Sequence, residues 1–280
     1  MKRHDPRRLG AALLCIAATG ALPAAAEPVS PVQSSARPFG LDTIADVYLR
    51  GSDEASAAFQ QETLPGLQRI VNENLSERQE VSDVAGIALN PTDLVLQAES
   101  ELRVYFVGEG AGYRNTLGFF TQGETLADAT DAALIFPDAS SDAYYDRYDG
   151  DARSRSAPLA PGDFVDLGSY DAGTSLDFFL VGNGANGGRN TYYAGPDRNP
   201  DGIEHFVVLA TPDSPFLLIG IEDLLGGGDM DYNDLVFALE VGVENAQKLI
   251  AAAVPLPPAA WAILGLGAAF GIRRVRQQAA

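Results

Sequence analysis

The sequence predicts a mainly β protein: an antiparallel β-sandwich of jelly-roll-like type, with a short N-terminal helical segment and a C-terminal transmembrane helix. Short apolar runs follow one another from residue 84, and Gly, Pro, Asn and Asp separate them, as in all-β folds. No helical pattern alternates with these runs, which argues against a nucleotide-binding α/β fold. An uncharged segment of 24 residues begins at Leu249 and is long enough to cross a bilayer.

The predicted strands belong to one domain that covers residues 84–245. Alternation and turn residues place them at 86–89, 93–98, 102–107, 116–121, 132–136, 163–167, 176–181, 203–210, 215–221 and 235–242.

The N-terminal part divides into three segments. Residues 1–26 have a basic start, an apolar stretch and a small-residue cleavage site, which together indicate a secretory signal peptide. Residues 27–51 are expected to be a loosely ordered leader. A helical segment is expected over 52–80, with Ser52 as its cap and an interruption at Pro65. The segment is compatible either with packing on the β domain or with a role as a spacer.

The C-terminal segment, residues 249–280, combines "VPLPP", an apolar stretch and an arginine cluster at Arg273, Arg274 and Arg276. The arginines are expected to hold this end in the cytoplasm. The pattern resembles the PEP-CTERM class of bacterial sorting signals in its VPLPA variant. That resemblance implies a Gram-negative cell, an inner-membrane-anchored intermediate and cleavage by an exosortase-type enzyme, followed by delivery to the cell envelope, the outer surface or the extracellular space.

The chain is strongly acidic, with a formal net charge of −19. Between the two terminal signals, residues 27–272 keep 37 of the 38 acidic and 12 of the 19 basic residues, which leaves a net charge of −25. Such a charge excludes a nucleic-acid binder, because phosphate contacts need a basic surface. It agrees with a solubility strategy or with binding of divalent cations.

Two short motifs concentrate side-chain oxygens. "DMDYND" carries Asp229, Asp231 and Asn233 at alternate positions, and "DRNPDG" carries Asp197, Asn199 and Asp201 in the same way. This spacing turns alternate oxygens toward one centre, as in calcium loops. A strand rather than a helix is expected after each motif, so neither is an EF-hand. Asp and Asn also form ordinary turns, which is the competing interpretation.

Strand pairing is expected to bring the two motifs together. The strand over 203–210 leaves the first motif, and the strand over 215–221 returns antiparallel and ends beside it. We therefore predict a Ca²⁺ site at this edge of the sheet, with nine candidate ligands: Asp197, Asn199, Asp201, Glu222, Asp223, Asp229, Asp231, Asn233 and Asp234.

Two glycine-rich loops have similar sequences, "VGEGAGYRNT" and "VGNGANGGRNT", and each directly follows a predicted strand. No helix follows either loop, so a phosphate site at a helix N-terminus is not expected. Tight structural turns are one interpretation. The other is that Glu109, Asn115, Asn183 and Asn190 present oxygens near one site.

Residues 102–242 resemble the domain-of-unknown-function family 4114. The resemblance depends on "NPDGIEHFVVL" and on "IEDLLGGGDMDYND" before a strand, with "VGEGAGYRNTLGFF" upstream. It implies a secreted or surface β-rich domain that binds calcium. The family hallmarks fall on His205, Glu222, Asp223, Gly227, Gly228, Asp229, Asp231, Asn233 and Asp234.

We expect no enzymatic activity. The chain between the signals has no cysteine and one histidine, His205, and no nucleophile-elbow motif. The expected use is adhesion or extracellular matrix association, with a surface polysaccharide as a candidate partner. The alternative is a carbohydrate-binding, lectin-like module or a secreted glycoside hydrolase, in which loop tyrosines stack on sugars and Glu109 and Glu222 form a carboxylate pair.

Overall fold

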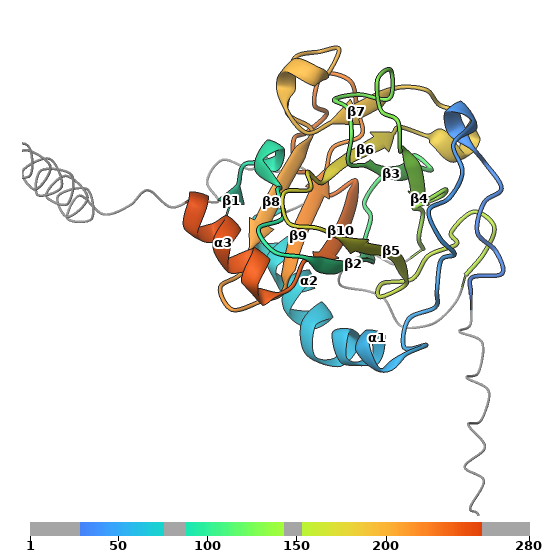
Figure 1. Ribbon diagram of the computed structural model, residues 1–280. Coiled ribbons are helices and arrows are strands. Elements are labelled where there is room, and N and C mark those ends of the chain that lie inside the picture. Colours follow the sequence, from blue (N-terminus) through green and yellow to red (C-terminus); the bar gives the residue numbers. More distant parts are fainter. Residues whose placement is uncertain (1–28, 76–87, 143–152, 254–280) are drawn as a thin grey trace, which may run out of the picture.

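The protein is described here from a computed structural model, in which residues 29–75, 88–142 and 153–253 are placed. Two antiparallel sheets form a sandwich (Figure 1). The six-stranded sheet has the order β1-β8-β9-β10-β2-β5, and the four-stranded sheet has the order β4-β3-β6-β7. The predicted mainly β sandwich is confirmed, although the described strands divide six and four rather than as in an eight-stranded jelly roll. The strands are β1 Ala88–Leu89, β2 Ser100–Gly108, β3 Thr116–Phe120, β4 Ala133–Phe136, β5 Phe164–Tyr170, β6 Asp177–Val181, β7 Thr191–Tyr193, β8 Phe206–Ala210, β9 Phe216–Ile221 and β10 Leu235–Glu240.

The central strands are buried on both faces. In β10, Phe237 packs into the core between the sheets and meets Phe178 of β6 at a ring-centroid distance of 5.1 Å. Its neighbours Val236 and Ala238 face the other side of the sheet and join a second core. Successive side chains of a strand point to opposite faces, so two covered faces require the uninterrupted apolar run seen here.

A helical layer provides that second core. Helix α1 (Glu54–Ala58), a π-helical turn η2 (Phe59–Thr63) and helix α2 (Leu64–Asn74) cover the outer face of the six-stranded sheet (Figure 1). Phe59 stacks on Tyr105 of β2 with ring centroids 3.9 Å apart. The helical segment thus packs on the β domain. Its cap is Asp53, whose carboxylate accepts a hydrogen bond from the Ser56 N–H, and not Ser52 as predicted.

The part of the leader that is described, residues 29–51, corrects the expectation of loose order. Tyr48 exchanges backbone hydrogen bonds with Phe164 of β5, and Ile44 donates to the Leu134 carbonyl of β4. Val47 is buried in the core between the sheets. The leader therefore covers the edge strands of both sheets, and its backbone groups take partners there.

Two further segments differ from the predictions. Residues 93–98 form no strand; the 3₁₀ turn η3 (Pro91–Asp93) is followed by a single bridge from Val95 to Ser175. Strand β7 was not predicted, because its three residues are too short to show a period. The other 3₁₀ turns are η1 (Pro38–Gly40), η4 (Gly184–Asn186) and η5 (Pro196–Arg198).

The described chain ends in helix α3 (Val243–Ala253), which contacts β1 and β9. Leu249, predicted to begin the sorting signal, is buried in the core between the sheets, so residues 249–253 belong to this packed helix. Among the described residues, no helix is long and apolar enough to cross a membrane. The predicted signal peptide and the rest of the predicted sorting signal lie outside the described residues.

Candidate metal centre

The hairpin of β8 and β9 brings the two acidic motifs to one edge of the sandwich, as predicted. Phe206 pairs with Ile221, and the Glu222 N–H donates to the His205 carbonyl over 3.0 Å. Beyond the strands, the Gly226 N–H donates to Oδ2 of Asp201 over 2.8 Å. The second motif therefore folds back onto the end of the first.

Two groups of carboxylates meet at this edge. Glu222, Asp223 and Asp234 each offer an oxygen within 4.8 Å of the others, and so do Glu222, Asp229 and Asp231. Glu222 belongs to both groups. Glu222, Asp223 and Asp231 are buried, Asp234 is half-buried and Asp229 is exposed. We call these five residues the acidic edge.

The backbone of the loop explains how so many acids fit. φ is positive at Gly228, Met230 and Tyr232, with values of 47°, 55° and 54°, and the residues between them do not share this conformation. Such alternation curls the chain at every second residue, so the intervening acids can converge. A side chain at position 228 would also displace Glu222, because a Cβ atom there would lie 2.3 Å from its Oε1.

Glu222 is the most unusual member of the acidic edge. Its side chain is only 1% exposed. Oε1 accepts a hydrogen bond from the Leu224 N–H over 3.3 Å, whereas Oε2 is buried and has no hydrogen-bond partner. Within the described ranges, no arginine or lysine forms an ion pair with Glu222, Asp223, Asp229 or Asp234. A buried carboxylate without a partner is costly unless a proton or a cation neutralises it.

The pKa values of these carboxyl groups also show that their negative charge is unfavourable here. Burial and the neighbouring Asp234 carboxylate raise the pKa of Glu222 to about 9. Burial, again with Asp234, raises the pKa of Asp223 to about 7, and burial raises the pKa of Asp234. Like charges at short distance cannot all ionise. The edge must therefore hold protons or bind positive charge.

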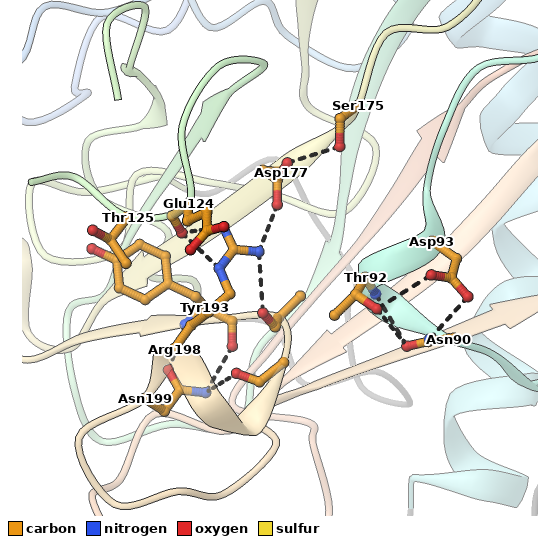
Figure 2. A network of polar contacts seen from close by, with 12 residues as sticks. Asn90, Thr92, Asp93, Glu124, Thr125, Ser175, Asp177, Tyr193, Arg198 and Asn199 are labelled. Carbon is orange, nitrogen blue, oxygen red and sulfur yellow. Dashed lines mark hydrogen bonds and ion pairs between the residues drawn. The ribbon is translucent and has the colours of Figure 1, made fainter. Parts of the chain in front are cut away.

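The first motif contributes less than predicted. Figure 2 shows Asn199 beside Tyr193. Oδ1 of Asn199 accepts from the Tyr193 N–H over 2.8 Å, and its amide nitrogen donates to the carbonyls of Tyr193, Gly195 and Ile203. These bonds give Asn199 a role in shaping the loop; Oδ1 accepts one of them, and its role as a ligand stays a prediction. Asp197 is exposed and lies in η5, outside both carboxylate groups.

Asp201 links this motif to the acidic edge. Burial acts to raise its pKa, but hydrogen bonds from the Gly226 N–H and from His205 lower the pKa overall. His205 is fully buried, with Nε2 at 3.0 Å from Asp201 Oδ2 and Nδ1 at 2.9 Å from the Glu222 carbonyl. Its ring stacks on Tyr192 at a centroid distance of 4.1 Å. Both ring nitrogens thus have partners, and they position the start of the acidic loop.

The glycine-rich loops line the same edge, which is one of the two interpretations that their sequence allows. Nδ2 of Asn115 donates to Oδ2 of Asp223 over 2.6 Å, and Oδ1 of Asn115 accepts from the Asn183 N–H over 2.9 Å. Burial raises the pKa of Glu109 to about 8, and Asp234 and Asp223 raise it further. Asn115, named from the sequence as an oxygen donor near one site, therefore contacts the acidic residues, but through its amide nitrogen.

The side chain of Asn233 also departs from the prediction. Its side-chain amide nitrogen donates to the Leu75 carbonyl over 3.3 Å, and its backbone carbonyl accepts from the Gly110 N–H over 2.9 Å. It joins the acidic loop to the end of α2 and to the first glycine-rich loop, in addition to any role as an oxygen donor.

Comparison with known families gives a match that covers the acidic edge. Residues 170–242 match the family model of DUF4114, a domain of unknown function. The DUF4114 segment contains β6 to β10 and the entire acidic edge. It begins later than the resemblance at residues 102–242, although β2 and β3 pair with β10 and β6 of the segment. No match was found among curated proteins or among solved structures.

Proposed function

We propose that this chain is an exported, non-enzymatic β-sandwich that is stabilised by Ca²⁺ bound at the acidic edge. The observation that carries the proposal is Glu222: a carboxylate 1% exposed, with one oxygen lacking a hydrogen-bond partner, shared by two groups of converging acids. Ion binding would neutralise that charge and turn mutual repulsion into coordination.

The chemistry of the donors favours a hard cation. The acidic edge offers carboxylate oxygens, and Ca²⁺ takes six to eight oxygen ligands, carboxylates and backbone carbonyls among them. Zn²⁺ prefers nitrogen and sulfur. The nearby His205 already uses both ring nitrogens, and the only cysteine of the chain, Cys15, lies in the predicted signal peptide. Glu222, Asp223, Asp229, Asp231 and Asp234 would hold the ion or ions.

Calorimetry and thermal melting of the purified full-length chain test this proposal. Ca²⁺ should bind and raise the melting temperature relative to chelator, with affinity near the 10⁻⁴–10⁻³ M typical of extracellular sites. Asp231→Asn should remove most of both effects while keeping the oxygen that accepts from the Asn233 N–H. Asp171→Asn is the matched control, because Asp171 is exposed in the turn after β5 and outside both carboxylate groups. Equal melting of the wild type with and without Ca²⁺, and no heat of binding, would refute the proposal.

We also propose that the chain is sorted to the cell envelope or surface and acts in adhesion or matrix association. Support comes from the signal peptide and the PEP-CTERM-like tail of the sequence, which lie outside the described residues. Mass spectrometry of the protein from its native cell should find no peptide beyond about Trp261; recovery of Gln277 at the mature C-terminus would disprove cleavage.

A further inference from the structure

A second site candidate lies away from the acidic edge. A cleft of about 540 Å³ opens between the turn η1 and the glycine-rich loop that follows β6. Its volume falls in the range of small-ligand sites. Figure 1 shows the two turns next to each other, in blue and in yellow. The lining residues are Ala36, Arg37, Pro38, Phe39, Gly40, Gly184, Gly187, Gly188 and Arg189.

The cleft is notable for its two arginines. At least four arginines in the described ranges pair with acids, among them Arg103 with Asp166, Arg114 with Asp138 and Arg198 with Asp177. In these same ranges, Arg37 and Arg189 pair with no carboxylate, although acids outnumber bases by two to one in the chain. Among the described residues, Arg37 donates only to the backbone carbonyls of Ser34 and Ala36. Two guanidinium groups without an acidic partner in one cleft of so acidic a protein mark a place that attracts negative charge.

Phe39 adds an apolar face to this charge. Its side chain is 45% exposed. The guanidinium carbon of Arg189 lies 5.6 Å from the centre of the ring, so the two groups are held together. The backbone of Phe39 adopts φ 57° and ψ 11°, a left-handed conformation that is strained for a bulky residue. Strain of this kind persists where the surrounding fold enforces it, often at binding sites.

The opposite wall is made of backbone. A Cβ atom on Gly187 would meet nothing within 4 Å, whereas one on Gly188 would lie 2.0 Å from the Gly182 carbonyl. Side chains are thus absent from this wall, in one case because none would fit. The N–H groups of Gly187 and Gly188 already donate to the carbonyls of Gly184 and Asn183, so this wall would act by accepting hydrogen bonds from the hydroxyl groups of a ligand.

We propose that this cleft binds a carboxylated sugar, such as a hexuronic acid unit of an acidic polysaccharide. Such a unit offers three features that match the two arginines, Phe39 and the glycine backbone in turn. Its carboxylate pairs with the planar forks of Arg37 and Arg189. Its C–H face packs on Phe39, and its hydroxyl groups meet the backbone of the glycine wall. A peptide carboxylate would provide the charge without the hydroxyl groups. This proposal stands independently of Ca²⁺ at the acidic edge.

Titration calorimetry of the full-length chain with trigalacturonate tests the proposal. Chelator is present throughout, because uronates themselves bind Ca²⁺, and a melting curve confirms that the protein is folded. The fully methyl-esterified trimer has the same ring without the charge and should bind at least about tenfold more weakly. Higher salt should weaken binding of the acid form, because the arginines are exposed.

Variants locate the site. Arg189→Gln and Arg37→Gln should each weaken binding of the acid trimer about tenfold, the loss expected for a charge-assisted hydrogen bond. Arg69→Gln is the matched control: Arg69 is exposed on α2, far from the cleft lining, and its loss should leave affinity unchanged. Four outcomes would each overturn the proposal. They are absence of binding by the folded wild type, equal binding of the ester, an equal loss in Arg69→Gln, and equal binding of triglutamate in place of the sugar.

Discussion

Replacement of Glu222 by glutamine should change stability in opposite directions with and without Ca²⁺. Gln keeps the size of the side chain and an oxygen that can accept from the Leu224 N–H. It removes the need to take up a proton at this position on folding and adds an amide N–H₂ that can donate to the Asp223 and Asp234 carboxylates, which lie within 4.8 Å. In chelator the variant should therefore be more stable than the wild type. With Ca²⁺ it should be less stable, because the ligand shared by both groups is lost.

The size of both effects follows from the site. Without an ion, the folded chain keeps Glu222 protonated up to about pH 9, whereas the side chain ordinarily ionises near 4.5. At pH 7.5 this gap of three pH units corresponds to about 4 kcal/mol of lost stability as an upper bound. We expect about half of that to be recovered by Gln, since the exposed Asp229 admits water to the edge. In contrast, Ca²⁺ at about 100 times its dissociation constant should stabilise the wild type by roughly 2.7 kcal/mol.

The assay is thermal melting of both proteins at pH 7.5, in chelator and in saturating Ca²⁺. For a domain of this size, 1 kcal/mol corresponds to roughly 2–4 °C. The variant should melt roughly 4–8 °C above the wild type in chelator and should lose most of the roughly 5–10 °C gain that Ca²⁺ gives the wild type. If Glu222→Gln lowers the melting temperature in chelator, or keeps the full calcium gain, the reasoning about an unneutralised buried carboxylate is wrong.

Three further predictions concern the same edge. Raised pKa values mean that the ion-free folded chain holds protons that the unfolded chain loses, so its stability should fall as pH rises from about 4.5 to about 9. Ca²⁺ should displace those protons. Calorimetry at pH 7.5 in buffers of different ionisation enthalpy would detect the proton release. Gly228→Ala should weaken Ca²⁺ binding at least about tenfold, because its Cβ would strike Glu222. Gly202→Ala, also at positive φ but in open space, should leave binding unchanged, and equal losses would assign the effect to backbone strain alone. Asn115→Ala should lower stability by about 1–3 kcal/mol in chelator melts, because it leaves the Asn183 N–H without its acceptor, and an unchanged melting temperature would contradict this.

The fold was predictable where one physical rule dominated. Nine of the ten described strands were found from short apolar runs between turn residues, and the juxtaposition of Asp201 with Gly226 followed from two antiparallel strands of similar length. The acidic character of the edge was equally visible, because Glu222 and Asp223 directly follow a strand. Local pattern and chain direction suffice for such features.

Other features depend on contacts between distant segments. Oxygen spacing alone did not distinguish Asn199, whose amide is used by its own loop, from the acids that converge. The polar composition of the leader gave no sign that Tyr48 would pair with β5. Turn-forming and ion-binding residues are of the same types, so only the direction of each side chain separates the two roles.

The two candidate sites share one structural element, and this bears on why the acids are concentrated at one edge. The loop after β6 supplies Gly184 and Arg189 to the cleft, and the same loop is fixed to Asp223 through Asn115. A negative ligand in the cleft would be repelled by unneutralised acids on the far side of this loop. Neutralising the acidic edge with Ca²⁺ would reduce that repulsion and hold the loop in place. Ca²⁺ and the cleft ligand would then each favour binding of the other by the same free energy, while the cleft would still bind its ligand without the ion.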